Sequence, residues 1–203
     1  GRIFSRIHKT LAPKGHTHPV ALMIFGPSAV GKSSISDASA NELLGSPENA
    51  VEVDGSHFRA EHAGWQAVTQ HGYEHSILHE EAWGKFKGSG ISSKLKKRVI
   101  AEVMDARQHM IVPDTLNQPE KTDKLLQQLV DAGYKLHAVC LWAPLKATRK
   151  RGEPRSVREG KVWSGDEYAM SARGTLKMAQ LFAQRLEAQD TSWKGLTMWD
   201  NTI

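Results

Sequence analysis

The sequence predicts a three-layer α/β fold in which a mainly parallel sheet of five strands is flanked by helices. Three observations support this prediction. Short apolar runs alternate along the chain with longer stretches of helical spacing, which favours a parallel sheet covered on both faces. A glycine-rich loop joins the first apolar run directly to the first helical stretch. Polar residues follow several of the runs, and ligands of such sheets bind beyond the carboxyl ends of the strands.

Each predicted strand is an apolar run bounded by turn-forming residues. The first run is apolar throughout, as expected for a strand that is buried on both faces. The five runs are Val20–Phe25, Ala50–Val53, Met110–Val112, Leu136–Trp142 and Leu196–Trp199.

The stretches between these runs have the spacing of helices. Gly88-Ser89-Gly90 separates the second helix from the third, and Gly133 is a typical stop for the fourth. Gly174 weakens the prediction for the first half of the last helix. The predicted helices are Lys32–Leu44, Ile77–Phe86, Ser92–Arg107, Gln118–Ala132 and Asp166–Ala188.

Length and composition are those of an ordinary globular protein. The 203 residues are 39% hydrophobic and 24% charged, which predicts a single domain over residues 1–203 with an N-terminal extension at 1–18. No run approaches the roughly 18–20 apolar residues of a membrane span, and residues 1–6 lack the apolar segment of a signal peptide. The single cysteine, Cys140, excludes an internal disulfide. A reducing compartment, and so a cytoplasmic location, is expected.

The charge balance is basic, with a formal net charge of +5 and a pI of about 9.3. A basic balance fits either nucleic acid or a pocket built for polyphosphate. The positive charge gathers in two places, at residues 94–98 and 146–161. We interpret the first cluster as a solvated helix face.

The strongest motif is an uninterrupted match to G-x-x-x-x-G-K-[ST], the phosphate-binding P-loop. Its glycines let backbone N–H groups point at phosphate oxygens, and the N-terminus of the following helix adds positive potential. Lys32, a predicted catalytic residue, is expected to reach the β- and γ-phosphates of ATP or GTP, while the Ser33 hydroxyl binds Mg²⁺. The predicted nucleotide-binding residues are Gly26, Pro27, Ser28, Ala29, Val30, Gly31, Lys32, Ser33 and Ser34.

The segment after the second predicted strand carries candidates for the acceptor side of a phosphoryl transfer. Asp54 follows that strand directly, and an acid in this place in P-loop kinases accepts the proton of the acceptor hydroxyl or helps to place Mg²⁺. Arg59 carries the forked guanidinium that binds anionic groups through two hydrogen bonds. The residues leave a second interpretation open, in which Asp54 caps a turn with Gly55 and Arg59 is a surface charge.

Asp114 and Thr115 follow the third predicted strand, at the edge of the sheet where ligands bind. Asp114 is predicted to bind Mg²⁺ through water or to position the acceptor, and Thr115 adds a hydroxyl on the substrate side. Both residues also precede the helical segment 116–132, so a helix N-cap is the alternative. We favour the functional interpretation because of the position at the ligand edge.

Five basic residues crowd a segment that also contains Gly152, Pro154 and Gly160. Arginines stabilise the charge that spreads over γ-phosphoryl oxygens during transfer. We therefore predict that residues 146–165 form a mobile, lid-like basic segment that closes over nucleotide and acceptor and excludes water. A solvated basic loop is the alternative. The five residues are Arg149, Arg151, Arg155, Arg158 and Lys161.

The motif D-G-x-x-F-R-x-x-H that begins at Asp54, with Trp65 after it, resembles the D-G-D-x-F-R-x-x-H-P-x-Y segment of the zeta toxin family of P-loop kinases. The resemblance extends along most of the chain, through residues 110–115, 141–151 and 199–201. Some members of this family phosphorylate UDP-N-acetylglucosamine. Related plant-pathogen effector kinases phosphorylate NAD on a ribose hydroxyl.

The resemblance implies an Mg²⁺-dependent kinase that moves the γ-phosphate of ATP or GTP to a hydroxyl of a small nucleotide-type acceptor, such as a UDP-sugar or NAD. It implies that Arg59 and His62 contact this acceptor, and that Arg151 acts in catalysis with either Arg158 or Lys161. It further implies an antitoxin or inhibitor protein as a partner. If the protein is a delivered effector, its location is a host cell.

Three departures from the family pattern bear on catalysis. The family's catalytic aspartate is the second acid of D-G-D, and Ser56 occupies that position here. Because serine alone is too weak a base near neutral pH, either Asp54 or His57 takes the role or the reaction differs; Asp54 is the best candidate. Residues 113–114 replace the family's Glu-Gly and residues 63–65 replace P-x-Y, so the acceptor pocket is expected to differ as well.

Two other functions stay open at this point. The positive charge favours a polynucleotide kinase, which would label oligonucleotides in place of metabolites. The serine at position 56 favours a catalytically degenerate protein that binds nucleotide and acts through partners.

Overall fold

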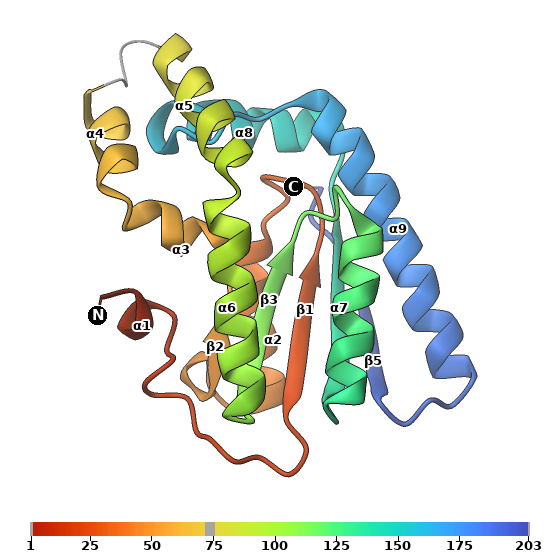
Figure 1. Ribbon diagram of the computed structural model, residues 1–203. Coiled ribbons are helices and arrows are strands. Elements are labelled where there is room, and N and C mark those ends of the chain that lie inside the picture. Colours follow the sequence, from red (N-terminus) through yellow and green to blue (C-terminus); the bar gives the residue numbers. More distant parts are fainter. Residues whose placement is uncertain (1, 72–75, 203) are drawn as a thin grey trace.

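The computed structural model describes residues 2–71 and 76–202, in which five strands form one sheet in the order β2-β3-β1-β4-β5 (Figure 1). Every pairing in this sheet is parallel, which confirms the predicted α/β fold. Each predicted strand is present, with small differences in its limits. The strands are β1 (Val20–Phe25), β2 (Ala50–Glu52), β3 (His109–Asp114), β4 (Lys135–Trp142) and β5 (Trp193–Asp200).

The predicted helices are also present, and the structure adds several that were not predicted. Gly90 separates α5 from α6, within the glycine-containing break that the sequence indicated. No helix within the described ranges has the length and apolar character needed to cross a membrane. The helices are α1 (Arg2–Arg6), α2 (Lys32–Leu44), the 3₁₀-helix η1 (Pro47–Asn49), α3 (Gly55–Ala60), α4 (Ala63–His71), α5 (Ser76–Ser89), α6 (Ile91–Asp105), α7 (Pro119–Asp131), α8 (Leu145–Glu159) and α9 (Gly165–Glu187).

Most of the segment that we predicted as a mobile lid is a helix. Residues 145–159 form α8 in spite of Pro154 in its interior. A proline removes one backbone hydrogen bond and strains the preceding turn, but pairs of opposite charge four residues apart support the helix on both sides of it. Arg149 pairs with Glu153 at 2.6 Å, and Arg155 with Glu159 at 2.7 Å.

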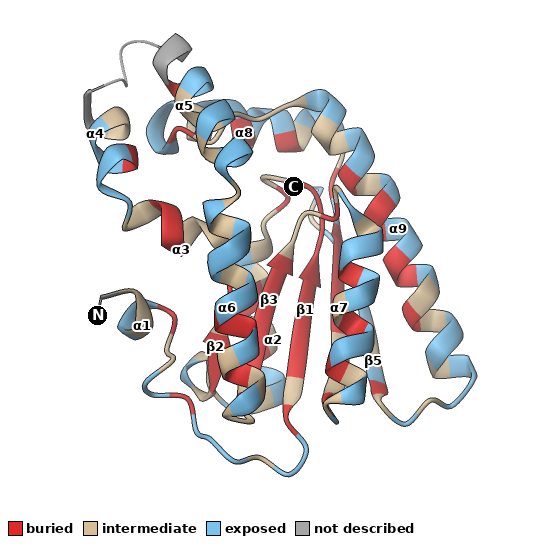
Figure 2. Cartoon of the chain, in the orientation of Figure 1, coloured by how far each residue is buried: buried red, intermediate tan, exposed pale blue. Residues whose placement is uncertain are grey.

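The core forms two clusters, one on each face of the sheet, and alternate residues of β1 belong to them. Nearly the whole of β1 is buried (Figure 2). Met23 and Phe25 belong to the larger cluster, together with apolar side chains of α6, α7 and α9. Leu22 and Ile24 belong to the smaller cluster, against which Ile35 and Leu44 of α2 pack. Helices therefore cover both faces, which explains why β1 is apolar throughout.

The N-terminal extension is tied to the edge of the sheet. The backbone N–H of Glu52 in β2 donates to the carbonyl of Ile7, and the Ile7 side chain is fully buried in the larger core cluster. Lys9 donates to the side chain of Gln108, just before β3. Residues 3–12 thus cover the edge of the sheet next to β2, which a bare strand would leave open to pairing with another chain.

The carboxyl ends of β1 and β3 lie side by side. Phe25 pairs with Asp114 across these strands, and the N–H of Gly26 donates to the Asp114 carbonyl at 3.2 Å. The residues after β1 and the end of β3 therefore meet at one edge of the sheet. Helix α8 runs across this edge in Figure 1.

Gly174 is the point at which α9 approaches the turn after β3. A Cβ atom there would overlap the backbone oxygen of Leu116, and the hydroxyl of Ser171 one turn earlier donates to the carbonyl of Thr115. From the sequence alone, Gly174 is only a weak point of a predicted helix. Close approach of two backbones explains it, because no larger residue fits.

Replacement of Gly174 by alanine is expected to destabilise the protein by about 1–3 kcal/mol, because a backbone atom cannot move aside as a side chain can. Urea unfolding of Gly174→Ala and wild type measures the difference. Gly84→Ala is the matched control, since an added Cβ at Gly84 in α5 meets nothing within 4 Å. The control should leave stability unchanged or raise it by about 0.5–1 kcal/mol; equal stability of Gly174→Ala and wild type would contradict the close approach.

Candidate active site

A cavity of about 420 Å³ opens at the carboxyl end of the sheet. It brings together the phosphate loop, the start of α3, one face of α6, the end of β3 and the basic side of α8. The lining residues are Ser28, Ala29, Gly31, Lys32, Ser33, Ser34, Asp54, Gly55, Ser56, Arg59, Lys96, Pro113, Asp114, Thr115, Arg151, Arg155, Arg158 and Lys161.

The phosphate loop has the curled backbone that the motif predicts. Ala29 and Gly31 take positive φ angles of 63° and 105°, so the chain turns back on itself before α2 begins at Lys32. Gly31 also lies against the Asn201 side chain, which a Cβ at this position would overlap. Glycine is therefore required at position 31 both by its conformation and by its neighbour.

The ammonium group of Lys32 lies inside the loop. It donates to the carbonyls of Gly26 at 2.6 Å and Pro27 at 2.8 Å. Burial, reinforced by the nearby charge of Lys161, lowers the pKa of Lys32 to about 7. A phosphate anion in the loop would favour the charged form of this side chain and raise the pKa again.

Asn201 ties the phosphate loop to two other parts of the site. Its side-chain N–H₂ donates to the carbonyl of Val30 at 2.8 Å, and its backbone N–H donates to the carbonyl of Trp142 at the end of β4. Its own carbonyl accepts a hydrogen bond from Arg151 of α8 at 3.0 Å. The loop and the basic helix are thus joined through one residue, which sequence reasoning noted as part of a motif but did not assign to the site.

Asp54 is the N-cap of α3. Its Oδ1 accepts a hydrogen bond from the backbone N–H of Ser56 at 2.8 Å. The interpretation of Asp54 as a capping residue is therefore correct. Asp54 also lines the cavity, and the two interpretations are therefore compatible. The cap fixes the carboxylate while its second oxygen stays available.

The carboxyl group of Asp54 is ionised at neutral pH. Burial alone would raise its pKa, but the Ser56 N–H and the charges of Lys96 and Lys161 outweigh this and lower the pKa below its usual range. Asp54 is thus a ready hydrogen-bond acceptor, although a weaker base than an ordinary carboxylate.

His57 and His62 do not line the cavity. The Nε2 of His57 lies 2.8 Å from Oε2 of Glu52, and this hydrogen bond raises the pKa of His57. The Nδ1 of His62 accepts the backbone N–H of Trp65 at the start of α4. His57 is thus paired with Glu52 and does not line the cavity, and the acceptor contact of His62 stays a prediction.

Asp114 and Thr115 lie where the sequence places them, on the wall of the cavity. Both carboxylate oxygens of Asp114 accept hydrogen bonds, from the backbone N–H of Leu116 at 2.8 Å and from the hydroxyl of Thr122 at 2.9 Å. These bonds hold the carboxylate in place and leave lone pairs that can face the cavity. The N-cap of α7 is Gln118, so the alternative interpretation of Asp114 and Thr115 as a helix N-cap does not hold.

Lys96 is a cavity residue that sequence reasoning missed. We interpreted residues 94–98 as a solvated face, but α6 packs against the start of α3, where the Ser92 hydroxyl approaches the carbonyl of Gly55 at 3.5 Å. This packing turns Lys96 toward Asp54, and its ammonium donates to the carbonyl of Pro113 at 3.3 Å. The signal was the spacing of Ser92 and Lys96, which places both on one face of the helix.

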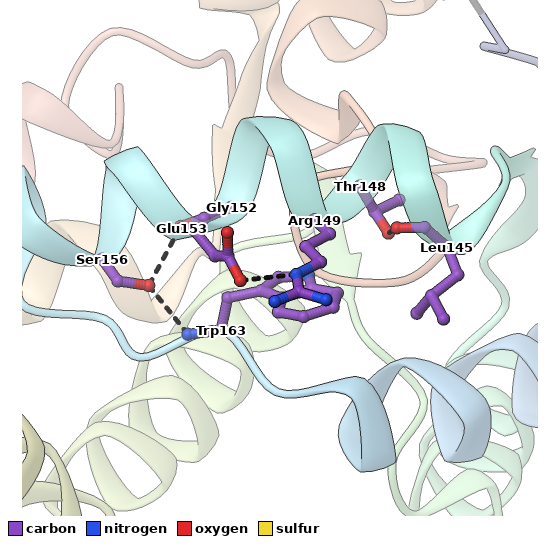
Figure 3. Close-up of polar contacts among 7 residues, drawn as sticks. All are labelled: Leu145, Thr148, Arg149, Gly152, Glu153, Ser156 and Trp163. Atoms are coloured by element: carbon purple, nitrogen blue, oxygen red, sulfur yellow. Dashed lines mark hydrogen bonds and ion pairs between the residues drawn. The ribbon is translucent and has the colours of Figure 1, made fainter.

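One face of α8 supplies arginines to the cavity. Arg151, Arg155 and Arg158 recur at helical spacing and line it, whereas Arg149 is exposed and pairs with Glu153 (Figure 3). The Ser156 hydroxyl donates to the carbonyl of Gly152 and accepts the backbone N–H of Trp163.

These bonds fold the chain that follows α8 back onto the helix (Figure 3). The indole of Trp163 packs directly on Gly152, where a Cβ would overlap the ring. Lys161, two residues before this tryptophan, lies in the cavity, and burial together with the charge of Arg59 lowers its pKa to about 8. The glycine that appeared to break the segment is thus a packing contact.

The cavity offers oxygen ligands of the kind that Mg²⁺ prefers, from the hydroxyl of Ser33 and the carboxylates of Asp54 and Asp114. Within residues 2–71 and 76–202, no cluster of three or more acidic, histidine or cysteine side chains forms a complete metal site. Proteins commonly hold Mg²⁺ through one or two carboxylates together with substrate phosphates.

Comparisons with known proteins point to one family and one fold. The family model described as zeta toxin matches residues 5–193. The fold is similar to a chain of the PezAT chromosomal toxin–antitoxin system of Streptococcus pneumoniae, with a TM-score of 0.63 and 16% identity over 98% of this chain and 75% of that chain. No curated protein matched the sequence.

The fold is also similar to two structures of AvrRxo1-ORF1:AvrRxo1-ORF2. In the structure with sulphate ions the TM-score is 0.56 at 13% identity, and in the structure with ATP it is 0.55 at 14% identity. Both matches cover 98% of this chain and 58% of that chain. At these identities the likeness concerns the fold alone.

Loss of the Asn201 side chain is expected to weaken nucleotide binding. Asn201→Ala removes the hydrogen bond that braces Val30, so the Kd for Mg·ATP should rise roughly three- to ten-fold. Isothermal titration calorimetry measures this change. Thr202→Ala is the control, because Thr202 is exposed and bonds only to its neighbour Asp200 among the described contacts. Equal Kd values for Asn201→Ala and wild type would show that the brace is dispensable.

Nucleotide binding is expected to take up a proton at about pH 8 and not at about pH 6. The pKa of Lys32 near 7 leaves this side chain largely neutral at the higher pH, and bound phosphate restores its charge, so affinity should fall as the pH rises through 7. Titration calorimetry in buffers of different ionisation enthalpy gives the proton count. The uptake should fall in Lys32→Met, with Lys161, whose pKa is about 8, as the source of what remains; the same count in both proteins would contradict the lowered pKa of Lys32.

Proposed function

The chain belongs to the zeta toxin family, and we propose that it is an Mg²⁺-dependent kinase that transfers the γ-phosphate of ATP or GTP to a hydroxyl of a small nucleotide-type acceptor. Family membership supports a nucleotide-binding phosphotransferase. The acceptor class, a UDP-sugar or an NAD-like molecule, is our proposal.

The distribution of charge carries this proposal. The cavity is lined by seven basic and two acidic side chains. Removing these from the chain's totals of 27 basic and 22 acidic residues leaves 20 of each. The whole net charge of +5 is therefore that of the cavity, and the remaining surface is balanced.

This distribution favours a small polyphosphate over a polynucleotide. A nucleic acid would need basic side chains along an extended surface to neutralise successive phosphates. A cavity of about 420 Å³ with concentrated positive charge suits compact, highly charged ligands. Since Mg·ATP carries about two negative charges, the surplus supports an acceptor that is itself anionic.

The phosphate loop would hold the nucleotide. Backbone N–H groups of residues 26–34 and the N-terminus of α2 would bind the phosphates, with Lys32 at the β- and γ-phosphates. Mg²⁺, held by Ser33 and Asp114, would neutralise charge on the phosphate oxygens.

Asp54 is our candidate for the general base. The acceptor oxygen would attack the γ-phosphorus as its proton passes to the Asp54 carboxylate, while the bond to the bridging oxygen breaks and the nucleoside diphosphate leaves with the electron pair. Arg59 and Thr115 would contact the acceptor. His62 remains a candidate on resemblance alone, because its side chain lies outside the cavity wall.

The basic residues of α8 would stabilise the charge that develops during transfer. Arg151 and Arg158, together with Lys161, lie on the cavity wall, and forked donors suit γ-phosphoryl oxygens. We further propose that residues 146–165 close over the ligands as a lid within a single domain, and so keep water from acting as the acceptor.

Partners and location rest on the relatives. The similar structures come from a toxin–antitoxin system and from a complex of two chains, AvrRxo1-ORF1 and AvrRxo1-ORF2. We propose that an antitoxin or inhibitor protein binds this chain too, and that it works in the cytoplasm of its own cell or of a host. A catalytically degenerate protein is the second candidate, and Ser56 is the observation that favours it.

Phosphate transfer from Mg·ATP and Mg·GTP to UDP-sugars, NAD, nucleosides and short oligonucleotides tests the proposal. Wild type should phosphorylate a small nucleotide-type acceptor. Asp54→Asn should lower kcat roughly 10²- to 10⁴-fold, as expected for loss of a general base, and Lys32→Ala should abolish transfer. His57→Gln is the control and should keep activity, because His57 pairs with Glu52 outside the cavity.

Two outcomes would contradict the proposed function. Labelled oligonucleotides without labelled metabolites would indicate a polynucleotide kinase. Nucleotide binding without any product, with activity appearing only in Ser56→Asp, would indicate a degenerate kinase that is kept for binding.

A further inference from the structure

We propose that the indole rings of Trp65 and Trp83 hold the guanidinium of Arg59 in place and so build a fixed site for a phosphate group that the acceptor already carries. We call this pair of contacting rings the aromatic clamp. This inference deepens the proposed function and rests on it for the identity of the ligand as the acceptor. Arg59 would touch the ligand, and the two tryptophans are positioning residues.

Three helices bring these side chains together. Arg59 comes from α3, Trp65 from α4 and Trp83 from α5. The central carbon of the guanidinium lies 5.8 Å from the ring centroid of Trp65 and 5.3 Å from that of Trp83. The two rings meet edge to face, with centroids 5.9 Å apart. Contacts of this kind between a guanidinium and indoles are favourable, most of all away from water.

Arg59 is a buried cation whose N–H groups lack a protein partner. It is 8% exposed and lines the cavity. Across residues 2–71 and 76–202, the carboxylates of Asp54 and Glu159 lie near enough to favour its charge, but no direct ion pair or hydrogen bond engages its N–H groups. Lys32 and Lys96 differ in this respect, since both donate to backbone carbonyls. No Arg59 nitrogen is among the described buried atoms that lack a partner, so its donors reach the cavity, where an anionic ligand can accept their hydrogen bonds.

The aromatic clamp explains why Arg59 stays in this place. Its rings cover the guanidinium with apolar surface and supply electrostatic attraction without occupying its N–H groups. A carboxylate in the same position would neutralise the charge and compete with an incoming anion. The forked donors are therefore left for a phosphate, whose oxygens match their spacing.

Trp65 is the buried member of the clamp, and Trp83 is the member whose substitution should disturb the fold less. Trp65 is 6% exposed and packs on Phe86, with ring centroids 5.2 Å apart, and on the backbone of Gly160. Trp83 is only partly buried. Replacement of Trp83 should thus affect Arg59 more than the fold.

Arg59 and the candidate base belong to the same short helix. Asp54 caps the start of α3 and Arg59 lies five residues later. Both line the same cavity. An acceptor whose phosphate binds Arg59 would therefore have its hydroxyl in the same cavity as the Asp54 carboxylate.

Binding of inorganic pyrophosphate tests the clamp without any turnover. The phosphate loop is first filled with a saturating amount of Mg²⁺ and a non-hydrolysable ATP analogue, and pyrophosphate is then titrated by calorimetry at fixed salt. Trp83→Leu should weaken pyrophosphate binding roughly five- to thirty-fold, the range expected for loss of a desolvated cation–π contact. Trp83→Phe, which keeps an aromatic face, should stay within about three-fold of wild type.

Trp199→Leu is the matched control, because Trp199 is an exposed tryptophan on β5 and should leave binding unchanged. Arg59→Gln should abolish pyrophosphate binding and leave the affinity for the ATP analogue unchanged. This variant tests the inference even if Trp83→Leu does not fold. Equal affinity in wild type and Trp83→Leu, or pyrophosphate binding that survives Arg59→Gln, would overturn the inference. The titration needs no catalysis. Failure of the proposed kinase activity would leave pyrophosphate binding intact, whereas failure of the clamp would change pyrophosphate binding without bearing on activity.

Discussion

Mutual repulsion among seven basic side chains in one cavity is the constraint on which the rest of the site depends. Two aspartates cannot balance them, so several of the cations are held by other contacts. Lys32 and Lys96 donate to backbone carbonyls. Arg155 pairs with Glu159, and Arg59 lies against two indoles that also contact each other. The cavity is thus prepared for polyanions without being filled by the protein's own acids, an arrangement that costs stability and favours ligand binding.

The parallel sheet makes this concentration of charge achievable. Phosphate loop, Asp54 and Asp114 each follow a strand, and parallel strands end at the same edge. Helix α9 approaches the turn after β3 through Gly174, and α6 approaches α3 through Gly55, where a Cβ would lie 2.5 Å from the Ser92 hydroxyl. Small residues at these crossings let helices carry polar side chains to the edge while their apolar faces fill the core.

The sequence was most informative where a function is encoded locally. The phosphate loop was predicted in full, because its chemistry depends on residues that are adjacent in the chain. Lys96 was missed because its direction depends on how α6 packs on α3. Helix α8 was missed because Gly152 and Pro154 are helix breakers in general, whereas here the glycine receives the Trp163 ring. His62 was expected at the acceptor, and its bond to the Trp65 N–H depends on a turn that no motif specifies.

The hydrogen bond from Asn201 to Val30 determines when, during synthesis, the phosphate loop can reach its binding geometry. Val30 and Asn201 are 171 positions apart, yet a single hydrogen bond joins them. A ribosome must therefore release residue 201 before the phosphate loop, which is synthesised much earlier, is fully supported. Long-range contacts of this type form late during folding, because the intervening chain must be ordered first. An incomplete nascent chain would carry the loop's sequence without its braced geometry, and this delays activity until synthesis has passed the last strand.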